Sequence, residues 1–305
     1  DDAAAFARFA QAAATHFKGK NVRYEIWNEP DTERFWPPAP DAHAFGDLLR
    51  AAAEAIRRAD PSAKVASGGV ARIDLPFLEA VASGGALSGL NALAFHPYRR
   101  AAPETFAADL PSLREFKTRA LGAQAELWDT EWGYASYDYF SKNISGDGHS
   151  AAGRKRQAVL GIREALTLYA LDLPLAVWYD LHDDGDDPKN PEHNYGLLDA
   201  KDAPKPAMAA LLQLTHLAAE HTFAGLLEGT PDGLHVMRWD GSDERVFVAW
   251  NDQPDAVVAL RTPGQGILRA TSFLGEPVKL KNGKQGELDW TLAEPDGPIY
   301  LAYRK

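Results

Sequence analysis

Five short apolar segments alternate with six longer segments of helical periodicity over residues 1–222. Strands that alternate with helices in this way are typical of βαβ units, whose strands lie parallel in one sheet. This alternation constrains the fold more than any other feature of the chain, and it predicts an α/β domain. The expected strands are residues 22–27, 64–69, 90–96, 125–132 and 174–180.

Several of the expected helices begin at residues that stabilise helix termini. The side chains of Asp41 and Ser150 can accept hydrogen bonds from the free N–H groups at the start of two helices. Pro206 suits the first turn of another helix, because its missing N–H has no partner there anyway. The sequence therefore predicts a first helix at residues 3–17 and a last one from Pro206 to about His221.

The pattern changes after about residue 222. Short runs of alternating apolar and polar residues follow, and turn residues such as Asp240-Gly241 separate them. Such runs predict a small antiparallel β-sandwich, with Trp239, Trp250 and Trp290 in its core. We therefore expect a catalytic α/β barrel domain at 1–222 and a β-sandwich domain at 223–305. The expected sandwich strands are residues 234–239, 245–250, 256–260, 267–273 and 298–303.

The composition excludes several classes of function. The chain has 32 Lys and Arg residues against 43 Asp and Glu residues, a net charge of −11, so nucleic acid is not an expected partner. No run of about 18 apolar residues is present, so no membrane span is expected. The absence of cysteine excludes disulfides, thiolate metal sites and cysteine nucleophiles.

Polar or glycine-rich residues follow all five expected strands, which is where the active site of an α/β barrel lies. Glu29 and Glu131 each end a strand and have aromatic neighbours. Retaining glycoside hydrolysis uses two carboxyl groups about 5–5.5 Å apart, and an apolar surrounding can raise the pKa of the acid. The alternative is that both are ordinary surface carboxylates. The first strand lacks the G-x-G-x-x-G turn of dinucleotide-binding proteins, so no cofactor is expected.

The segment YEIWNEP at residues 24–30 resembles the strand-4 signature of clan A glycoside hydrolases. The resemblance implies that Asn28 binds the 2-hydroxyl of the substrate and that Glu29 is the acid/base. Glu131, in LWDTEWG, is similar to the strand-7 nucleophile of that clan. The two glutamates lie 102 residues apart with two expected strands between them, as strands 4 and 7 require.

Further residues make the chain most similar to glycoside hydrolase family 39, which includes β-xylosidases, α-L-iduronidases and bacterial exopolysaccharide glycosidases. His96-Pro97-Tyr98 resembles the strand-6 element of the clan, and Trp178 resembles its strand-8 platform. Phe35-Trp36, the segment 193–197 and the trailing sandwich are similar to family 39 in particular. The resemblance implies a retaining hydrolase that cleaves an oligo- or polysaccharide through a covalent glycosyl-enzyme, secreted or periplasmic in a bacterium.

If Glu29 ends strand 4, the chain provides strands 4–8 of a (β/α)8 TIM barrel and lacks strands 1–3. Five strands cannot close an eight-stranded barrel. We therefore expect an open arc with an unpaired edge beside residues 22–27, or closure by a second polypeptide that supplies strands 1–3. The resemblance implies that further substrate-binding residues lie on those strands.

The remaining candidates are substrate-binding residues. Aromatic rings such as those of Trp36, Trp132, Trp178, Tyr139 and Phe140 can stack on sugar faces or can simply pack in the core. Asp180 and His193 can bind sugar hydroxyls or can satisfy loop groups. The acidic loop at 183–187 lacks the glutamate of an EF-hand, so no metal is expected. Two other functions stay open, a non-catalytic carbohydrate-binding remnant and a transglycosidase with the same residues.

Overall fold

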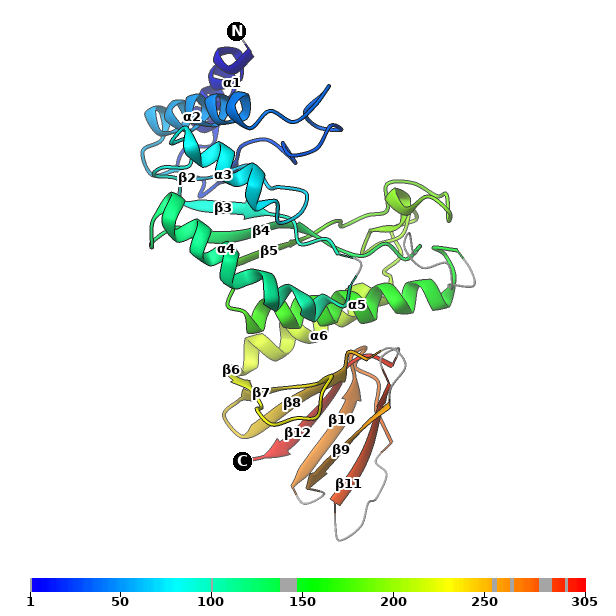
Figure 1. Cartoon of the computed structure of the whole chain (residues 1–305). Coiled ribbons are helices and arrows are strands. Elements are labelled where there is room, and N and C mark those ends of the chain that lie inside the picture. Colours follow the sequence, from blue (N-terminus) through cyan, green and yellow to red (C-terminus); the bar gives the residue numbers. More distant parts are fainter. Residues whose placement is uncertain are drawn as a thin grey trace. The chain divides into compact units, whose positions relative to one another are not determined.

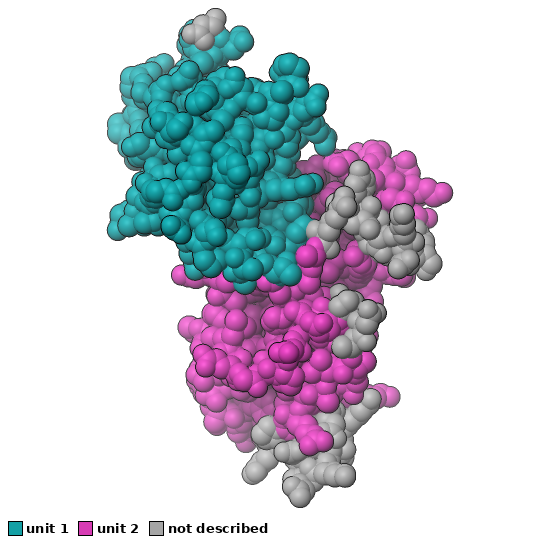
Figure 2. Space-filling model, viewed as in Figure 1, with its two compact units in different colours: residues 1–99, 105–132, 173–178 teal, residues 100–104, 133–172, 179–305 magenta. Residues whose placement is uncertain are grey.

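The computed structural model describes residues 2–99, 101–137, 147–253, 257–263, 266–279, 287–293 and 296–305. The chain divides into two compact units, shown in different colours in Figure 2. The first comprises residues 1–99, 105–132 and 173–178, and the second comprises residues 100–104, 133–172 and 179–305. This division does not follow the expected boundary at residue 222, which stays a prediction.

The first unit contains a five-stranded parallel sheet in the order β1-β2-β3-β4-β5. Figure 1 shows β2 to β5 side by side. The five expected parallel strands and their order are confirmed, and β1 has no strand on its outer side within the described residues. The strands are β1 (Arg23–Glu25), β2 (Lys64–Ala66), β3 (Ala92–Phe95), β4 (Glu126–Trp132) and β5 (Leu175–Trp178).

The parallel sheet is curled. Thr130 Oγ1 on β4 donates a hydrogen bond of 2.9 Å to Glu25 Oε1 on β1, although two strands lie between them. In a flat sheet, strands spaced about 4.8 Å apart would put β1 and β4 about 14 Å apart. Side chains on the concave face can meet only because the sheet curls. The sheet therefore forms part of a barrel, as expected, and leaves it open.

Each parallel connection runs through a helix, as βαβ units require. Asp41 accepts hydrogen bonds from the N–H groups of His43 and Ala44, and Ser150 accepts one from Gly153, so both expected caps are confirmed. The buried face of α2 includes Phe45, Leu49 and Ile56, as its periodicity predicts. The helices of the first unit are α1 (Asp2–Phe17), α2 (Ala42–Ala59), α3 (Leu75–Ser83) and α4 (Phe106–Leu121).

The second unit combines two helices, α5 (Ala151–Ala170) and α6 (Pro206–Glu220), with two antiparallel sheets. The larger sheet has the order β10-β12-β8-β7-β6, and β11 pairs with β9. Trp290 is buried in the core cluster of the sandwich, as predicted. Trp239 and Trp250 are buried too, but Trp239 packs against Tyr169 of α5, and the Trp250 indole donates a hydrogen bond to Glu104. The strands are β6 (Thr222–Leu226), β7 (Leu234–Asp240), β8 (Glu244–Asn251), β9 (Val257–Pro263), β10 (Ile267–Ser272), β11 (Glu287–Ala293) and β12 (Ile299–Arg304).

Two of these strands, β6 and β11, were not expected from the sequence. β6 begins two residues after the end of α6, so no turn residues mark its start. Gly225 also weakens its strand pattern. β11 does carry the period-two signal of a strand, since Leu288, Trp290 and Leu292 alternate with polar residues. None of the helices in the described residues combines the length and apolar character that crossing a bilayer needs.

A buried ion pair stabilises the second unit. Lys205 Nζ lies 2.8 Å from Asp183 Oδ1, with both side chains at most 1% exposed, and it also donates to the Asn194 carbonyl. Lys205→Met leaves Asp183 buried without its cation, which typically costs about 3–5 kcal/mol. We expect urea unfolding to show a fall of this size in the free energy of unfolding. Lys201→Met, at an exposed position of the same loop, is the control, and an equally small loss in both variants would contradict the prediction.

Candidate active site

The carboxyl ends of the parallel strands bring four of the predicted site residues together. Glu29 follows β1, His96 and Tyr98 follow β3, and Glu131 lies in β4. The segment after β1 is held against the end of β2, because the Glu29 N–H donates to the Gly69 carbonyl at 2.9 Å. Trp27 and Glu29 have positive φ angles of 74° and 42°, an uncommon conformation that is found at functional sites.

The side chains of these four residues form two hydrogen-bonded pairs. His96 Nδ1 lies 3.0 Å from Glu29 Oε1, and the Tyr98 hydroxyl donates to Glu131 Oε1 at 2.9 Å. One oxygen of Glu29, one oxygen of Glu131 and one nitrogen of His96 all lie within 4.8 Å of one another. The two carboxyl groups are therefore close together, as retaining glycoside hydrolysis requires.

His96 is the buried centre of the group, with 1% of its side chain exposed. Burial by itself would lower the pKa of the imidazole. The hydrogen bond to Glu29 and the negative charges of Glu131 and Glu25 outweigh burial, so the pKa of His96 is raised. A protonated His96 donates its Nδ1 proton to Glu29 and places a positive charge between the two carboxylates.

The same atoms of Glu29, His96 and Glu131 are the one group of the described residues whose spacing could hold a metal ion. Three protein ligands are enough for a catalytic zinc site. However, His96 Nδ1 and Glu29 Oε1 already share a hydrogen bond, which a metal ion would have to break. A site without a metal or cofactor remains our prediction.

The three tryptophans expected to bind sugar differ in their surroundings. Trp132 is buried, and its ring meets that of Trp178 edge-on at 4.8 Å. Trp36 packs edge-on against Trp27 and Phe45. Trp36 and Trp178 keep part of their surface exposed. Core packing therefore accounts for Trp132, whereas Trp178 and Trp36 still have surface that a sugar could contact.

Asp180 and His193 belong to the second unit, where they make local contacts. Burial and the charges of Asp184 and Asp183 raise the pKa of Asp180 to about 6. His193 Nδ1 accepts a hydrogen bond from the Asp187 N–H within the acidic loop, which accounts for its position. Their expected contacts with substrate stay predictions. Tyr139 and Phe140 lie outside the described residues.

Three residues of the site were not predicted from the sequence. Glu25 Oε1 accepts hydrogen bonds from the Gly69 N–H at 2.7 Å and from Thr130 Oγ1 at 2.9 Å. Thr130 directly precedes Glu131, and Gly69 also holds the backbone of Glu29. The sequence did hold one signal for Glu25. It is a carboxylate within the expected buried strand VRYEIW, and burying a carboxylate is costly unless it is paired or hydrogen-bonded.

Gly69 has no room for a side chain. A Cβ atom there would lie 2.3 Å from His96 Nε2 and 2.8 Å from Glu25 Oε1. Gly69→Ala must therefore displace His96. We expect the free energy of unfolding, measured by thermal unfolding, to fall by about 1–3 kcal/mol, as overpacking typically causes. Gly84→Ala is the control, because its Cβ would have no neighbour closer than 3.9 Å. Equal stability of the two variants would contradict this account.

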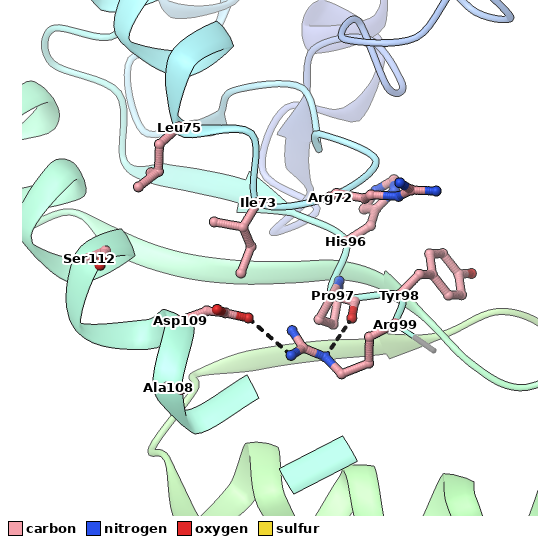
Figure 3. Close-up of a pocket in the computed structure, with 10 residues that line it drawn as sticks. All are labelled: Arg72, Ile73, Leu75, His96, Pro97, Tyr98, Arg99, Ala108, Asp109 and Ser112. Carbon is pink, nitrogen blue, oxygen red and sulfur yellow. Dashed lines mark hydrogen bonds and ion pairs between the residues drawn. The ribbon is translucent and has the colours of Figure 1, made fainter. Parts of the chain in front are cut away.

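A pocket of about 330 Å³ lies beside His96 and Tyr98, within the size range of small-molecule sites. Its walls are the loops after β2 and β3 and the helix α4 (Figure 3). Arg99 crosses it and donates to the Pro97 carbonyl and to Asp109, at 3.1 and 3.0 Å. The pocket thus adjoins the two residues that contact the carboxylates.

Comparison with known proteins identifies the fold. No protein-family model and no curated protein matches the sequence. A family 39 glycoside hydrolase from the gut symbiont Bacteroides cellulosilyticus WH2 superimposes with a TM-score of 0.78 and 22% identity over 97% of this chain. This chain spans 61% of that enzyme's length.

Two other solved structures are similar over nearly the whole chain. A glucosidase from Croceicoccus marinus gives a TM-score of 0.66 at 14% identity, covering 100% of this chain and 75% of its own. A monomeric β-xylosidase from Caulobacter crescentus CB15 gives a TM-score of 0.63 at 17% identity, and the match covers 98% of this chain and 74% of the xylosidase chain. The chain therefore shares its fold with these glycoside hydrolases, and its described residues form part of a barrel followed by antiparallel sheets.

Proposed function

We propose that this chain carries the catalytic carboxylates of a retaining O-glycosidase that hydrolyses an oligo- or polysaccharide. The observation that carries the proposal is the pair Glu29 and Glu131, with one oxygen of each and a His96 nitrogen within 4.8 Å of one another. The fold shared with glycoside hydrolases supports it. The family 39-like fold makes a family 39 type of activity the first to test.

In the first step, Glu131 attacks the anomeric carbon while the bond from that carbon to the leaving oxygen breaks. Glu29 gives its proton to the leaving oxygen, so the products are a glycosyl ester of Glu131 and the released alcohol. The Tyr98 hydroxyl donates a hydrogen bond to Oε1 of Glu131 and thereby orients the carboxylate. His96 fixes the orientation of Glu29.

In the second step, Glu29 takes a proton from a water molecule that attacks the anomeric carbon. The ester bond breaks and Glu131 leaves as a carboxylate, so the anomeric configuration is retained. Asn28, next to Glu29 on a backbone paired with Gly69, is the proposed ligand of the 2-hydroxyl. A hydrogen bond to that hydroxyl strengthens in the transition state.

The proposal includes further binding residues from outside these 305 residues. The described sheet has five strands, and its outer strands β1 and β5 each lack a neighbour on one side. A second polypeptide that supplies the first three barrel strands would cover these edges. The open sheet is also the observation that favours the second candidate, a carbohydrate-binding protein without catalysis. A secreted or periplasmic location remains part of the proposal.

A trapping experiment tests the proposal. A 2-deoxy-2-fluoro glycoside with an activated leaving group forms the glycosyl ester quickly but hydrolyses slowly. We expect intact-mass analysis to show one added sugar, and peptide mapping to place it on Glu131. The fluoro-xyloside, fluoro-glucoside and fluoro-iduronide are tried in parallel. Binding of these sugars without covalent addition would favour the non-catalytic candidate instead.

A further inference from the structure

A third carboxylate lies beside the two proposed catalytic ones. Glu25 is the last residue of β1 and lies four residues before Glu29 in the sequence. Its Oε1 accepts hydrogen bonds from two donors on other parts of the sheet. One donor is the N–H of Gly69 at the end of β2, and the other is the hydroxyl of Thr130 on β4. A single oxygen atom thus joins β1, the end of β2 and β4 across the concave face.

Both donors are adjacent to the proposed catalytic residues. Thr130 precedes Glu131 in the chain, so its hydrogen bond fixes the strand from which Glu131 extends. Gly69 gives its N–H to Glu25 and accepts the N–H of Glu29 at its carbonyl. The contacts of Glu25 therefore link the backbone at Glu29 to the backbone at Glu131.

Glu25 also lies near the second nitrogen of His96. His96 Nε2 and Glu25 Oε1 both come within 2.8 Å of the position that a Cβ of Gly69 would take. On the other side of the ring, His96 Nδ1 bonds Glu29. The imidazole thus has a carboxylate near each of its nitrogens, and negative charges at this distance favour its protonated form.

We propose that Glu25 is a positioning residue, which sets the spacing of Glu29 and Glu131 through Gly69 and Thr130 and holds a negative charge beside His96. Burial raises the pKa of Glu25, whereas its hydrogen bonds from Gly69 and Thr130 act against this rise. The charge of ionised Glu25 favours the protonated form of His96, which donates a hydrogen bond to Glu29. The contribution to catalysis rests on the proposed function, whereas the effect on His96 does not.

Five charged or titratable groups face His96. They are Glu25 on β1, Glu29 in the segment after β1, Glu131 on β4, Tyr98 in the same loop as His96, and Arg72 in the loop after β2.

Two variants separate the charge of Glu25 from its hydrogen bonds. Glu25→Gln keeps an oxygen that can accept from Gly69 and Thr130 but removes the charge. Glu25→Asp keeps the charge but is one methylene too short to reach both donors. Glu33→Gln, the same substitution at an exposed position of the loop after β1, is the matched control.

The readout is the titration of His96 followed by NMR, which requires no activity. In Glu25→Gln we expect the His96 midpoint to move to lower pH by roughly half a pH unit or more. The His96 midpoint stays unchanged in Glu33→Gln. In Glu25→Asp we expect the Gly69 amide proton signal to move upfield, because it loses its acceptor, with a smaller change at His96.

The kinetic readout is the pH profile of kcat/KM for an activated aryl glycoside. Glu131 loses a nearby negative charge in Glu25→Gln, so we expect the acidic limb to move to lower pH. An unchanged His96 midpoint in Glu25→Gln, or an unchanged Gly69 amide in Glu25→Asp, overturns the proposal, and either variant suffices if the other does not fold. A shifted His96 midpoint in a chain without glycosidase activity refutes the proposed function and leaves the role of Glu25 at His96 intact.

Discussion

Glu131→Ala will lose turnover on the order of 10⁴-fold or more in kcat, because no covalent intermediate can form without the nucleophile. Tyr98 then loses its acceptor, but the remaining pair of His96 and Glu29 stays in place. Added azide fits the space of the missing carboxylate and attacks the anomeric carbon in its place. If the natural bond is β, the rescued product is the α-glycosyl azide, because azide attacks the anomeric carbon directly and inverts its configuration once.

The measurement is the rate of aryl glycoside cleavage with and without azide, with the product configuration assigned by NMR. Direct replacement of the nucleophile predicts the α-glycosyl azide from a β-glycoside. Glu126→Ala is the control, because Glu126 is on the same strand and bonds the Trp128 indole rather than a site residue. Normal activity in Glu131→Gln would remove Glu131 from the role of nucleophile.

Glu29→Ala will affect substrates with poor leaving groups most. An alkoxide leaving group needs a proton from Glu29, whereas an activated aryl group leaves almost unaided. We expect kcat/KM for a natural oligosaccharide to fall by about 10²–10⁴-fold, the usual contribution of general acid catalysis, and to fall much less for a dinitrophenyl glycoside. The glycosyl-enzyme should then accumulate, because no base activates water in the second step.

Pre-steady-state release of dinitrophenol checks this expectation, since accumulation of the intermediate gives a burst followed by a slow phase. Glu33→Ala, in the exposed part of the same loop, serves as the control. An equal loss for both kinds of leaving group, without a burst, would show that Glu29 does not act as the acid/base.

The order of the secondary structure elements could be predicted from the sequence because it depends on local patterns. Apolar periodicity indicated the helices, and the capping residues Asp41 and Ser150 located the starts of α2 and α5. The strands before Glu29 and Glu131 were predicted for the same reason. Where local signals were weak, as at β6, or were present but overlooked, as at β11, the strand was not predicted.

The composition of the site was predictable only in part. Glu29, His96, Tyr98 and Glu131 each follow or end a strand, and parallel strands bring their carboxyl ends to one edge of the sheet. Trp132 also ends a strand, yet the fold buries it against Trp178. Strand-end position alone therefore does not tell a residue that faces a substrate from one that packs in the interior.

Local patterns in the sequence were enough to predict the helices, the five parallel strands and their order, and to select Glu29 and Glu131 as candidates for glycoside chemistry. Which side chains meet depends on the three-dimensional packing of the chain. Glu25 and Thr130 are 105 residues apart and lie on strands that a flat sheet would keep well separated. The curl of the sheet brings them together, and the absence of a Cβ at Gly69 lets His96 and Glu25 approach the same point. Curl and close approach arise from the packing of distant segments, which no local pattern encodes.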